Sequence, residues 1–272
     1  MRLVDGRHGR FFVLDTDLYV GRALLTYGEW TEPEVALLSQ MLVPGHCVAD
    51  IGANLGSHTV PFARAVREEG WVVAFEPQPR IFQLLASNVT INGLANVQLY
   101  HAACGSAPGI LKVPSIDYGV AANFGGVEIK ALEAQGQAAG SRVHHVPIVR
   151  FDDVFDRDRL NLLKIDVEGM EREVLAGAER ALERFRPLIY VENEKPEDSP
   201  GLLRLLHDLG YVAYWHIVPF FDPANFRRHP NDVFTESGKP MGCVNNLCVP
   251  REARMDVRGL DQVRAVTEHP RS

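Results

Sequence analysis

The chain has 272 residues, a formal net charge of −7 and 46% hydrophobic residues, which is enough to bury the core of one large domain. The mild acidity argues against a protein held by nucleic acid phosphates, and no apolar run is long enough to span a bilayer. Charged residues interrupt the first stretch, where a signal peptide would lie, and the 4 cysteines form no C-x-x-C pair. We therefore expect reduced thiols and a cytoplasmic protein.

The first 40 residues are predicted to form a region ahead of the main fold. Residues 1–26 alternate loosely between apolar and polar side chains, which predicts one or two short strands. A helix follows, in which Thr31 resembles an N-cap and Glu34 occupies the capping-box position. The helix is expected to stop at the Pro-Gly pair of residues 44–45.

A strand, a glycine turn and a helix are predicted over residues 48–66. An apolar run that ends in Asp50 is typical of a buried parallel strand, and Gly52 and Gly56 bracket Asn54 in the turn that follows. Glycine lets the chain turn tightly and approach a ligand, and the start of the next helix presents unpaired N–H groups. The pattern indicates a nucleotide-type binding site.

Two acids indicate which ligand this turn binds. The spacing Asp-x-Gly-x-x-x-Gly lacks the dinucleotide fingerprint Gly-x-Gly-x-x-Gly, which disfavours a dehydrogenase. The second strand, residues 71–77, ends in Glu76, whose carboxylate suits two ribose hydroxyls, while Asp50 suits a cationic amino group. A ligand with an amino acid end and a ribose end but no phosphates is S-adenosylmethionine, which we therefore expect as the cofactor.

A helix from Pro79 and a third strand at residues 97–103 continue the alternation of a doubly wound α/β fold. Cys104 and Gly105, at the end of that strand, are expected to approach the adenine. Between residues 106 and 149 two strands flank a loop rich in Gly, Ala and Gln. We favour a substrate-facing hairpin insertion over plain disorder, because long loops in compact domains are usually functional.

Two further strands end in polar side chains that could bind a metal. Residues 160–169 are predicted to form a buried strand ending in Asp166 and Glu168, beside the first turn, where ligands bind in open parallel sheets. The fifth strand ends in Glu192 and Asn193. Two carboxylates and an amide oxygen suit Mg²⁺, so Asp166, Glu192 and Asn193 form a candidate metal site. The alternative is that these acids only cap the sheet edge or pair with basic side chains.

The end of the chain is expected to close the sheet. Residues 211–217 and 246–249 are predicted to be the last two strands, an antiparallel pair at the edge. His216 is the candidate base for a reaction without metal, because an imidazole suits proton transfer near neutrality; a packed, satisfied histidine is the alternative. The polar, weakly periodic residues 251–272 predict a short helix and a frayed tail.

Four stretches, in this order, resemble one family. The chain looks like the FkbM family of methyltransferases over about residues 27–250, on the strength of Asp50-Ile-Gly-Ala-Asn-Leu-Gly56, Ala74-Phe-Glu-Pro77, Leu163-Lys-Ile-Asp-Val-Glu-Gly169 and Asn246-Leu-Cys-Val-Pro250. The resemblance implies an α/β, Rossmann-like class I methyltransferase that uses S-adenosylmethionine. It also implies a mostly parallel seven-stranded sheet with helices on both faces and an antiparallel edge strand. Family members mostly methylate hydroxyl groups of polyketides, sugars and glycolipids.

By position, the resemblance also assigns roles. Asp166 and Glu168 would lie near the transferred methyl, and Tyr27 would cover the methionyl side of the cofactor. Separately from the resemblance, we expect residues 1–40 to pack over the cofactor site and residues 41–250 to form the methyltransferase domain. The other residues expected at the cofactor are Asp50, Gly52, Ala53, Asn54, Gly56, His58, Thr59, Glu76, Pro77, Ala103 and Cys104.

The expected function is O-methylation of a hydroxyl group on a small-molecule or carbohydrate acceptor, with no nucleic acid partner and with a homodimer left open. One alternative is a catalytically silent binding module in a biosynthetic assembly, against which the intact set of Asp50, Glu76 and Asp166 argues. Another is an N-methyltransferase. It is disfavoured because Asp166-Val-Glu-Gly169 stands where many amino-group methylators carry an Asn/Asp-Pro-Pro-Tyr/Phe stretch.

Overall fold

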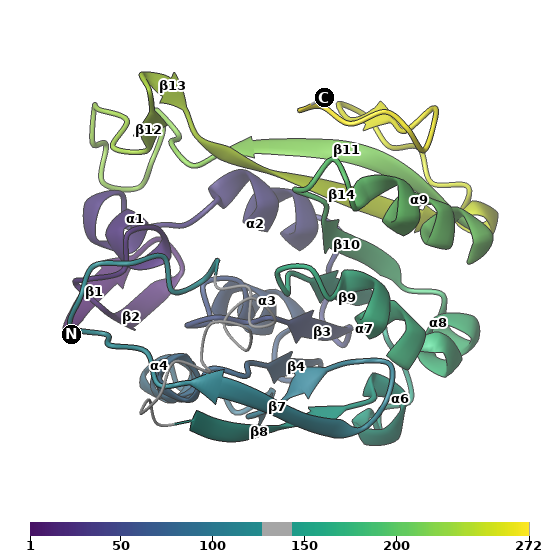
Figure 1. The fold of residues 1–272 in the computed structure, drawn as a ribbon, viewed down its shortest axis with the longest axis horizontal. Coiled ribbons are helices and arrows are strands. Elements are labelled where there is room, and N and C mark those ends of the chain that lie inside the picture. Colours follow the sequence, from purple (N-terminus) through teal and green to yellow (C-terminus); the bar gives the residue numbers. More distant parts are fainter. Residues whose placement is uncertain (127–142, 272) are drawn as a thin grey trace.

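A central sheet of eight strands organises the protein, of which the computed structural model describes residues 1–126 and 143–271. Neighbouring strands follow the order β15-β11-β14-β10-β9-β3-β4-β5 (Figure 1). The strands of this sheet are β3 (Cys47–Ile51), β4 (Trp71–Phe75), β5 (Val97–Tyr100), β9 (Leu162–Ile165), β10 (Leu188–Glu192), β11 (Tyr211–Pro219), β14 (Gly242–Pro250) and β15 (Asp261–Gln262).

The directions of the strands confirm the doubly wound α/β fold. Strands β5, β4, β3, β9 and β10 run parallel to one another, so their carboxyl ends meet at one edge of the sheet. Strands β11 and β14 form the predicted antiparallel pair, and the long strand β14 lies between β11 and β10. The outermost strand is β15, a two-residue addition that gives eight strands where we expected seven.

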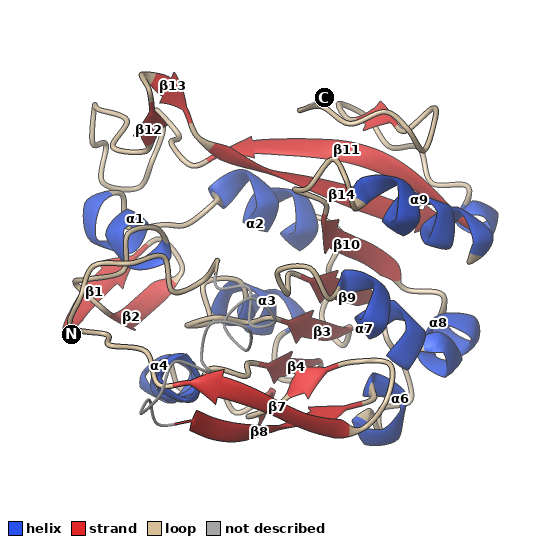
Figure 2. Ribbon diagram, viewed as in Figure 1, coloured by secondary structure: helices blue, strands red, loops and turns tan. Residues whose placement is uncertain are grey.

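Helices cover both faces of this sheet, as Figure 2 shows by colour. The helices are α1 (Val20–Thr26), α2 (Glu32–Ser39), α3 (Thr59–Val66), α4 (Pro79–Ile91), α6 (Phe151–Val154), α7 (Glu171–Gly177), α8 (Glu179–Phe185), α9 (Ser199–Asp208) and a 3₁₀ turn, η1 (Arg251–Ala253). In the described part of the chain, none of these has the length and apolar character that a membrane span needs.

Alternate residues of each strand enter two separate cores, because successive side chains of a strand point to opposite faces. One core packs α6 to α9 against residues that include Ile51 and Leu163. The other packs α2 and α3 against Val48 and Leu162. Burial of both faces explains why the strand sequences are nearly continuous apolar runs.

The N-terminal region is a hairpin followed by two short helices. Strands β1 (Arg2–Gly6) and β2 (Gly9–Val13) pair antiparallel, which confirms the predicted short strands. The predicted capping box is wrong: Thr31 has a left-handed φ of 42° and makes no cap hydrogen bond, although helix α2 begins at the next residue. The carboxylate of Glu34 contacts the ring of His58 instead of the backbone of the first turn.

A second, small sheet follows the third strand of the main one. Its strand order is β6-β8-β7, with β6 (Ala103–Cys104), β7 (Gly109–Pro114) and β8 (Val143–Val149). Strands β7 and β8 are antiparallel partners, as a hairpin requires. Residues 127–142, which connect them, lie outside the described residues, so the substrate-facing role of the insertion stays a prediction.

The C-terminal segment packs on the sheet, whereas we expected a frayed tail. Val263 and Val266 contact Trp215 and Leu203, next to the point where β15 joins β11. The ring of His269 meets the indole of Trp215 edge-on, with ring centroids 5.4 Å apart. Few residues of this segment are apolar, so its sequence shows little hydrophobic periodicity and did not predict that the segment packs on the sheet.

Candidate active site

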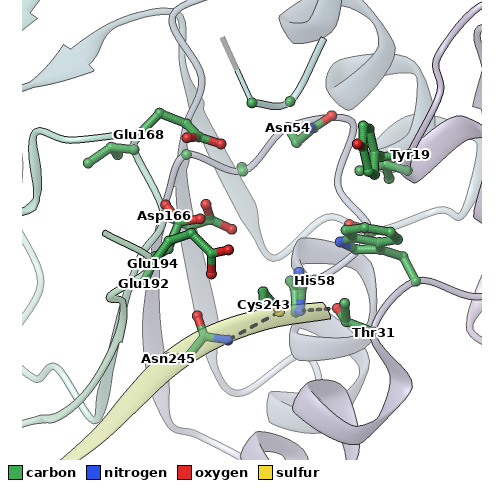
Figure 3. Close-up of a pocket in the computed structure, with 18 of the residues that line it drawn as sticks. Tyr19, Thr31, Asn54, His58, Asp166, Glu168, Glu192, Glu194, Cys243 and Asn245 are labelled. Atoms are coloured by element: carbon green, nitrogen blue, oxygen red, sulfur yellow. Dashed lines mark hydrogen bonds between the residues drawn. The ribbon is translucent and has the colours of Figure 1, made fainter. Parts of the chain in front are cut away.

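A cavity of about 550 Å³ opens at the carboxyl ends of β3, β4, β9 and β10 (Figure 3). The turn after β3 forms one part of its wall, and residues from α1, α2 and β14 form another. A short hairpin of β12 (Thr235–Glu236) and β13 (Lys239–Pro240) also contributes to the lining. Ligands of doubly wound α/β proteins bind at this edge of the sheet.

Most of the residues predicted at the site line this cavity. They include the turn after β3, the acid that follows β4 and the acids that follow β9 and end β10. The predicted residues in the lining are Gly52, Ala53, Asn54, His58, Glu76, Pro77, Ala103, Cys104, Asp166, Glu168 and Glu192.

The turn after β3 has a backbone that few residues tolerate. Gly52 has a φ of 82°, and a Cβ atom there would overlap the carbonyl oxygen of Asp166. Asn54 and Glu168 are left-handed without being glycine, with φ values of 51° and 55°, and both line the cavity. Strained backbone of this kind persists where the surrounding structure enforces it, and it is concentrated at functional sites.

Glu76 joins the two loops that border the cavity. Its Oε2 accepts a hydrogen bond from the backbone N–H of Asn54 at 3.0 Å, and its Oε1 accepts one from the N–H of Gln78 at 2.7 Å. Burial raises its pKa to about 7, although these two backbone hydrogen bonds act in the opposite direction. A carboxylate offers about four acceptor positions, so two remain for hydroxyl groups of a ligand.

Three carboxylates gather on one side of the cavity. Asp166, Glu168 and Glu192 each present an oxygen within 4.8 Å of the others, and Figure 3 shows them across the open space from Tyr19. Burial and then the charges of Asp166 and Glu168 raise the pKa of Glu192 well above its ordinary value. Such a group favours a cationic ligand, because positive charge offsets the repulsion among the acids.

A buried lysine ties two of the predicted acids together. Lys164 is only 2% exposed, and its Nζ lies 3.1 Å from Asp166 Oδ2 and 3.5 Å from Asp50 Oδ1. Burial alone would lower the pKa of Lys164, but the charges of Asp166, Asp50 and Glu34 outweigh it and raise the pKa. Sequence reasoning gave this residue no role, although a lysine within an apolar strand has to find an acid partner.

The structure corrects the direct cofactor contact predicted for Asp50. The carboxylate is fully buried behind the cavity wall and does not line the cavity. Its Oδ2 accepts a hydrogen bond from the hydroxyl of Thr59 at 2.6 Å, so Thr59 also faces inward. Gly56, with a φ of 94°, shapes the turn without lining the cavity. These three residues support the binding turn from behind.

Three further side chains were predicted to lie at the site, but in the structure they do not line the cavity. Tyr27 is buried in an aromatic cluster, where its ring lies 5.5 Å from that of Phe221. His216 is directed to the hydroxyl of Tyr190, 2.8 Å away, and does not line the cavity. Asn193 does not line the cavity, and its amide nitrogen donates to Asn246 Oδ1 at 2.7 Å. Of the three predicted metal ligands, Asp166 and Glu192 lie together with Glu168 in the carboxylate cluster.

The wall opposite the acids is aromatic, and sequence reasoning predicted neither Tyr19 nor Trp30 there. Tyr19, Trp30 and Phe220 all line the cavity. The rings of Trp30 and Phe220 lie 4.8 Å apart, and those of Tyr19 and Phe220 lie 5.7 Å apart with an edge contact. An apolar platform facing a group of carboxylates suits a ligand that has both a flat or cyclic body and polar substituents.

Comparison with known proteins points to one family. The family described as "Methyltransferase FkbM domain" matches residues 50–213. Methyltransferase sdnD of Sordaria araneosa is 24% identical over 223 residues, which cover 69% of this chain and 86% of that protein. The 31-O-demethyl-FK506 methyltransferase FkbM of Streptomyces tacrolimicus is 28% identical over 208 residues, which cover 66% of this chain and 78% of that protein. The family match includes the turn after β3 and the acids after β4 and β9, whereas α2 and β14 lie outside it.

Proposed function

Because the chain belongs to the FkbM family of methyltransferases, we propose that it transfers a methyl group from S-adenosylmethionine to a hydroxyl group of a small molecule. The acceptor classes we propose are sugars, glycolipids and polyketide-type natural products. The observation that carries the proposal is a single cavity in which Glu76 and the turn after β3 meet the carboxylates of Asp166, Glu168 and Glu192.

The residues of the cavity fit the chemistry of S-adenosylmethionine. Glu76 retains acceptor positions for two ribose hydroxyls, and Cys104 and Ala103 line the same cavity. The acids near Asp166 suit the positive charge of the sulfonium, which supplies an electrophilic methyl group when the cofactor is bound. Asp166 and Glu168 would therefore lie close to the methyl group.

Two observations favour a hydroxyl acceptor. The aromatic wall of Tyr19, Trp30 and Phe220 suits a ring, and the opposite carboxylates accept hydrogen bonds from hydroxyl groups. In addition, one relative is named as a methyltransferase of 31-O-demethyl-FK506, a name that specifies an oxygen. One alternative is that the protein transfers the methyl group to a nitrogen atom instead of an oxygen atom. The other is that it is a binding module without catalytic activity.

Other aspects of the sequence-based hypothesis stay predictions. Magnesium has one observation in its favour, the three clustered carboxylates, and acidic groups of this kind are common without an ion. A cytoplasmic location, the absence of a nucleic acid partner and a homodimer are likewise expectations from the sequence. The C-terminal residues 251–272 are proposed to belong to the folded domain, since they pack on its sheet.

The first test is calorimetric titration with S-adenosylmethionine and with S-adenosylhomocysteine, each with and without Mg²⁺. We expect micromolar binding that Glu76→Ala weakens by at least tenfold, because two hydrogen bonds to the ribose are lost. Transfer of labelled methyl to hydroxylated sugars and macrolide alcohols, with the matching amines as controls, then separates O- from N-methylation. Binding without transfer to any probe would favour the silent module, and a change with Mg²⁺ would favour the metal.

A further inference from the structure

His58 and Glu34 form a nearly buried pair on the wall of the cavity. The imidazole Nε2 lies 3.2 Å from Glu34 Oε2, and each side chain is 5% exposed. Both residues line the cavity, and Figure 3 shows His58 between the clustered carboxylates and Thr31. Glu34 lies on helix α2, and His58 is the residue before helix α3. The two residues are therefore far apart in the sequence, and no local sequence motif predicts their contact.

The carboxylate of Glu34 is held from several directions. Cys243 Sγ donates to its Oε1 at 3.0 Å, and Asn245 Nδ2 donates to the same oxygen at 3.3 Å. Burial alone would raise the pKa of Glu34, but the contacts with His58 and Cys243 and the charge of Lys164 outweigh burial, and the pKa is lowered. An ionised Glu34 keeps the hydrogen of the imidazole on the nitrogen that faces it.

The other ring nitrogen of His58 is the one left for chemistry. Nε2 is engaged by Glu34 and also lies 3.5 Å from Thr31 Oγ1. Among the described residues, Nδ1 of His58 has no hydrogen-bond partner. An imidazole that donates from Nε2 carries a lone pair on Nδ1, which can accept a proton.

We propose that His58 accepts the proton of the acceptor hydroxyl during methyl transfer and that Glu34 is its positioning residue; this rests on the proposed function. The hydroxyl oxygen forms a bond to the methyl carbon while the carbon–sulfur bond breaks, and the electron pair of that bond stays on sulfur. The hydroxyl proton passes to Nδ1 of His58 and then to water. The products are a methyl ether, S-adenosylhomocysteine and one proton.

Several titratable groups face this pair from the elements packed around it. Cys243 on β14 and Lys164 on β9 interact directly with the charge of Glu34. Tyr190 on β10 and His216 on β11 also interact with that charge. Burial, and then the charge of Glu34, raises the pKa of Tyr190 well above its ordinary value. Burial lowers the pKa of His216 and outweighs the charge of Glu34, which acts in the opposite direction. His216 is directed to the hydroxyl of Tyr190 rather than to the cavity, so it serves as a matched control.

The state of the ring can be measured without knowing the acceptor. Long-range ¹H–¹⁵N correlation spectra of the labelled full-length protein with S-adenosylhomocysteine report which ring nitrogens carry hydrogen, and His58→Gln assigns the signal. At pH 8 we expect hydrogen on Nε2 and none on Nδ1, and Glu34→Gln should produce a mixture of the two tautomers. Hydrogen on both nitrogens at pH 8 would overturn the proposal, because a locked imidazolium cannot accept a proton.

Turnover gives the second readout, with methyl β-D-glucopyranoside and the other hydroxyl probes of the acceptor screen. His58→Gln should lower kcat by about 100-fold or more, a loss much larger than any change in the Kd of S-adenosylhomocysteine. Glu34→Gln should lower kcat less and shift the pH profile, while His216→Gln keeps the wild-type rate. Wild-type turnover in His58→Gln overturns the inference alone, whereas failure of the wild-type protein to bind the cofactor refutes the proposed function.

Discussion

Glu76 is a buried carboxyl group whose charge state should control cofactor binding. Its pKa is raised to about 7 by burial, and ribose hydroxyls would donate to its ionised form. The affinity for S-adenosylhomocysteine should therefore be constant above pH 7 and fall as the pH drops below it, by up to about tenfold per pH unit. Calorimetry between pH 5.5 and 8.5 measures this dependence. Glu76→Gln should bind weakly at every pH, and a parallel curve for the two proteins would contradict the assignment.

The raised pKa of Glu76 also determines whether its contribution to folding stability increases or decreases with pH. The folded protein holds the proton of Glu76 more tightly than the unfolded chain, whose carboxyl titrates near 4.5. The contribution of this group to stability is therefore present below about pH 4.5 and is lost as the pH rises through about 7. Bound cofactor should reverse part of this loss, since it stabilises the ionised group.

Asp50 now has a structural role, so its substitution should affect folding before it affects binding. Asp50→Asn removes one of the two carboxylates that lie within 4 Å of the buried ammonium of Lys164, and the free energy of unfolding should fall by about 3 kcal/mol. Chemical denaturation measures the change. Asp256→Asn is the matched control, because its carboxylate is 71% exposed in a surface pair with Arg258 and should change stability by less than about 0.5 kcal/mol. Equal effects of the two changes would contradict a stabilising contact between Asp50 and Lys164.

At the scale of single elements, two glycines allow the effect of a steric clash to be distinguished from the effect of backbone strain. One is Gly52, in the turn between β3 and α3, and the other is Gly93. Gly52 and Gly93 both have positive φ angles, 82° and 67°, but only Gly52 has a neighbour that a methyl group would strike. Gly93→Ala should cost about 1 kcal/mol of stability and leave cofactor binding unchanged. Gly52→Ala should cost more and abolish binding, because the end of β9 must move. Thermal unfolding and calorimetry of both variants test this difference, and equal binding by both would contradict it.

The predictable residues are those with a local pattern around them. Gly52, Glu76 and Asp166 each follow an apolar strand, and the end of a strand in a doubly wound sheet is a known place for ligands. Glu34 could not be found in this way, because its partner His58 comes from another element and its own pattern imitated a capping box. The contact of Asn193 could not be found either, because its amide nitrogen donates to Asn246, which lies on a strand far away in the sequence.

The strands themselves could also be predicted from local sequence patterns. The order in which they lie side by side in the sheet could not be predicted. Strands β3, β4 and β9 are continuous apolar runs because helices cover both of their faces. The position of β14 between β10 and β11 depends on pairing over long sequence distances, which no local pattern encodes. The same holds for β15, whose two residues carry no strand signal of their own.

For the whole molecule, the C-terminal segment should matter to stability through its apolar contacts. Removal of residues 261–272 would uncover Trp215 and delete Val263 and Val266 from their cluster. We expect a loss of about 2 kcal/mol and a red shift of tryptophan emission, measured by thermal unfolding and fluorescence. Removal of residues 271–272 alone breaks the ion pair between Arg271 and Glu194 but keeps the apolar contacts, so it should change stability little. A truncated protein as stable as the full chain would contradict this role.

The position of β14 also bears on how the protein is made. Strand β11 leaves the ribosome before β14 exists, yet in the described parts of the chain β14 is the strand that connects β11 to β10 and the rest of the sheet. Until about residue 250 has been translated, β10 therefore presents an unpaired row of N–H and C=O groups, which is the feature that lets strands of different chains associate. A nascent chain stalled in this interval would be prone to aggregate, whereas the finished chain closes the gap with its own last long strand.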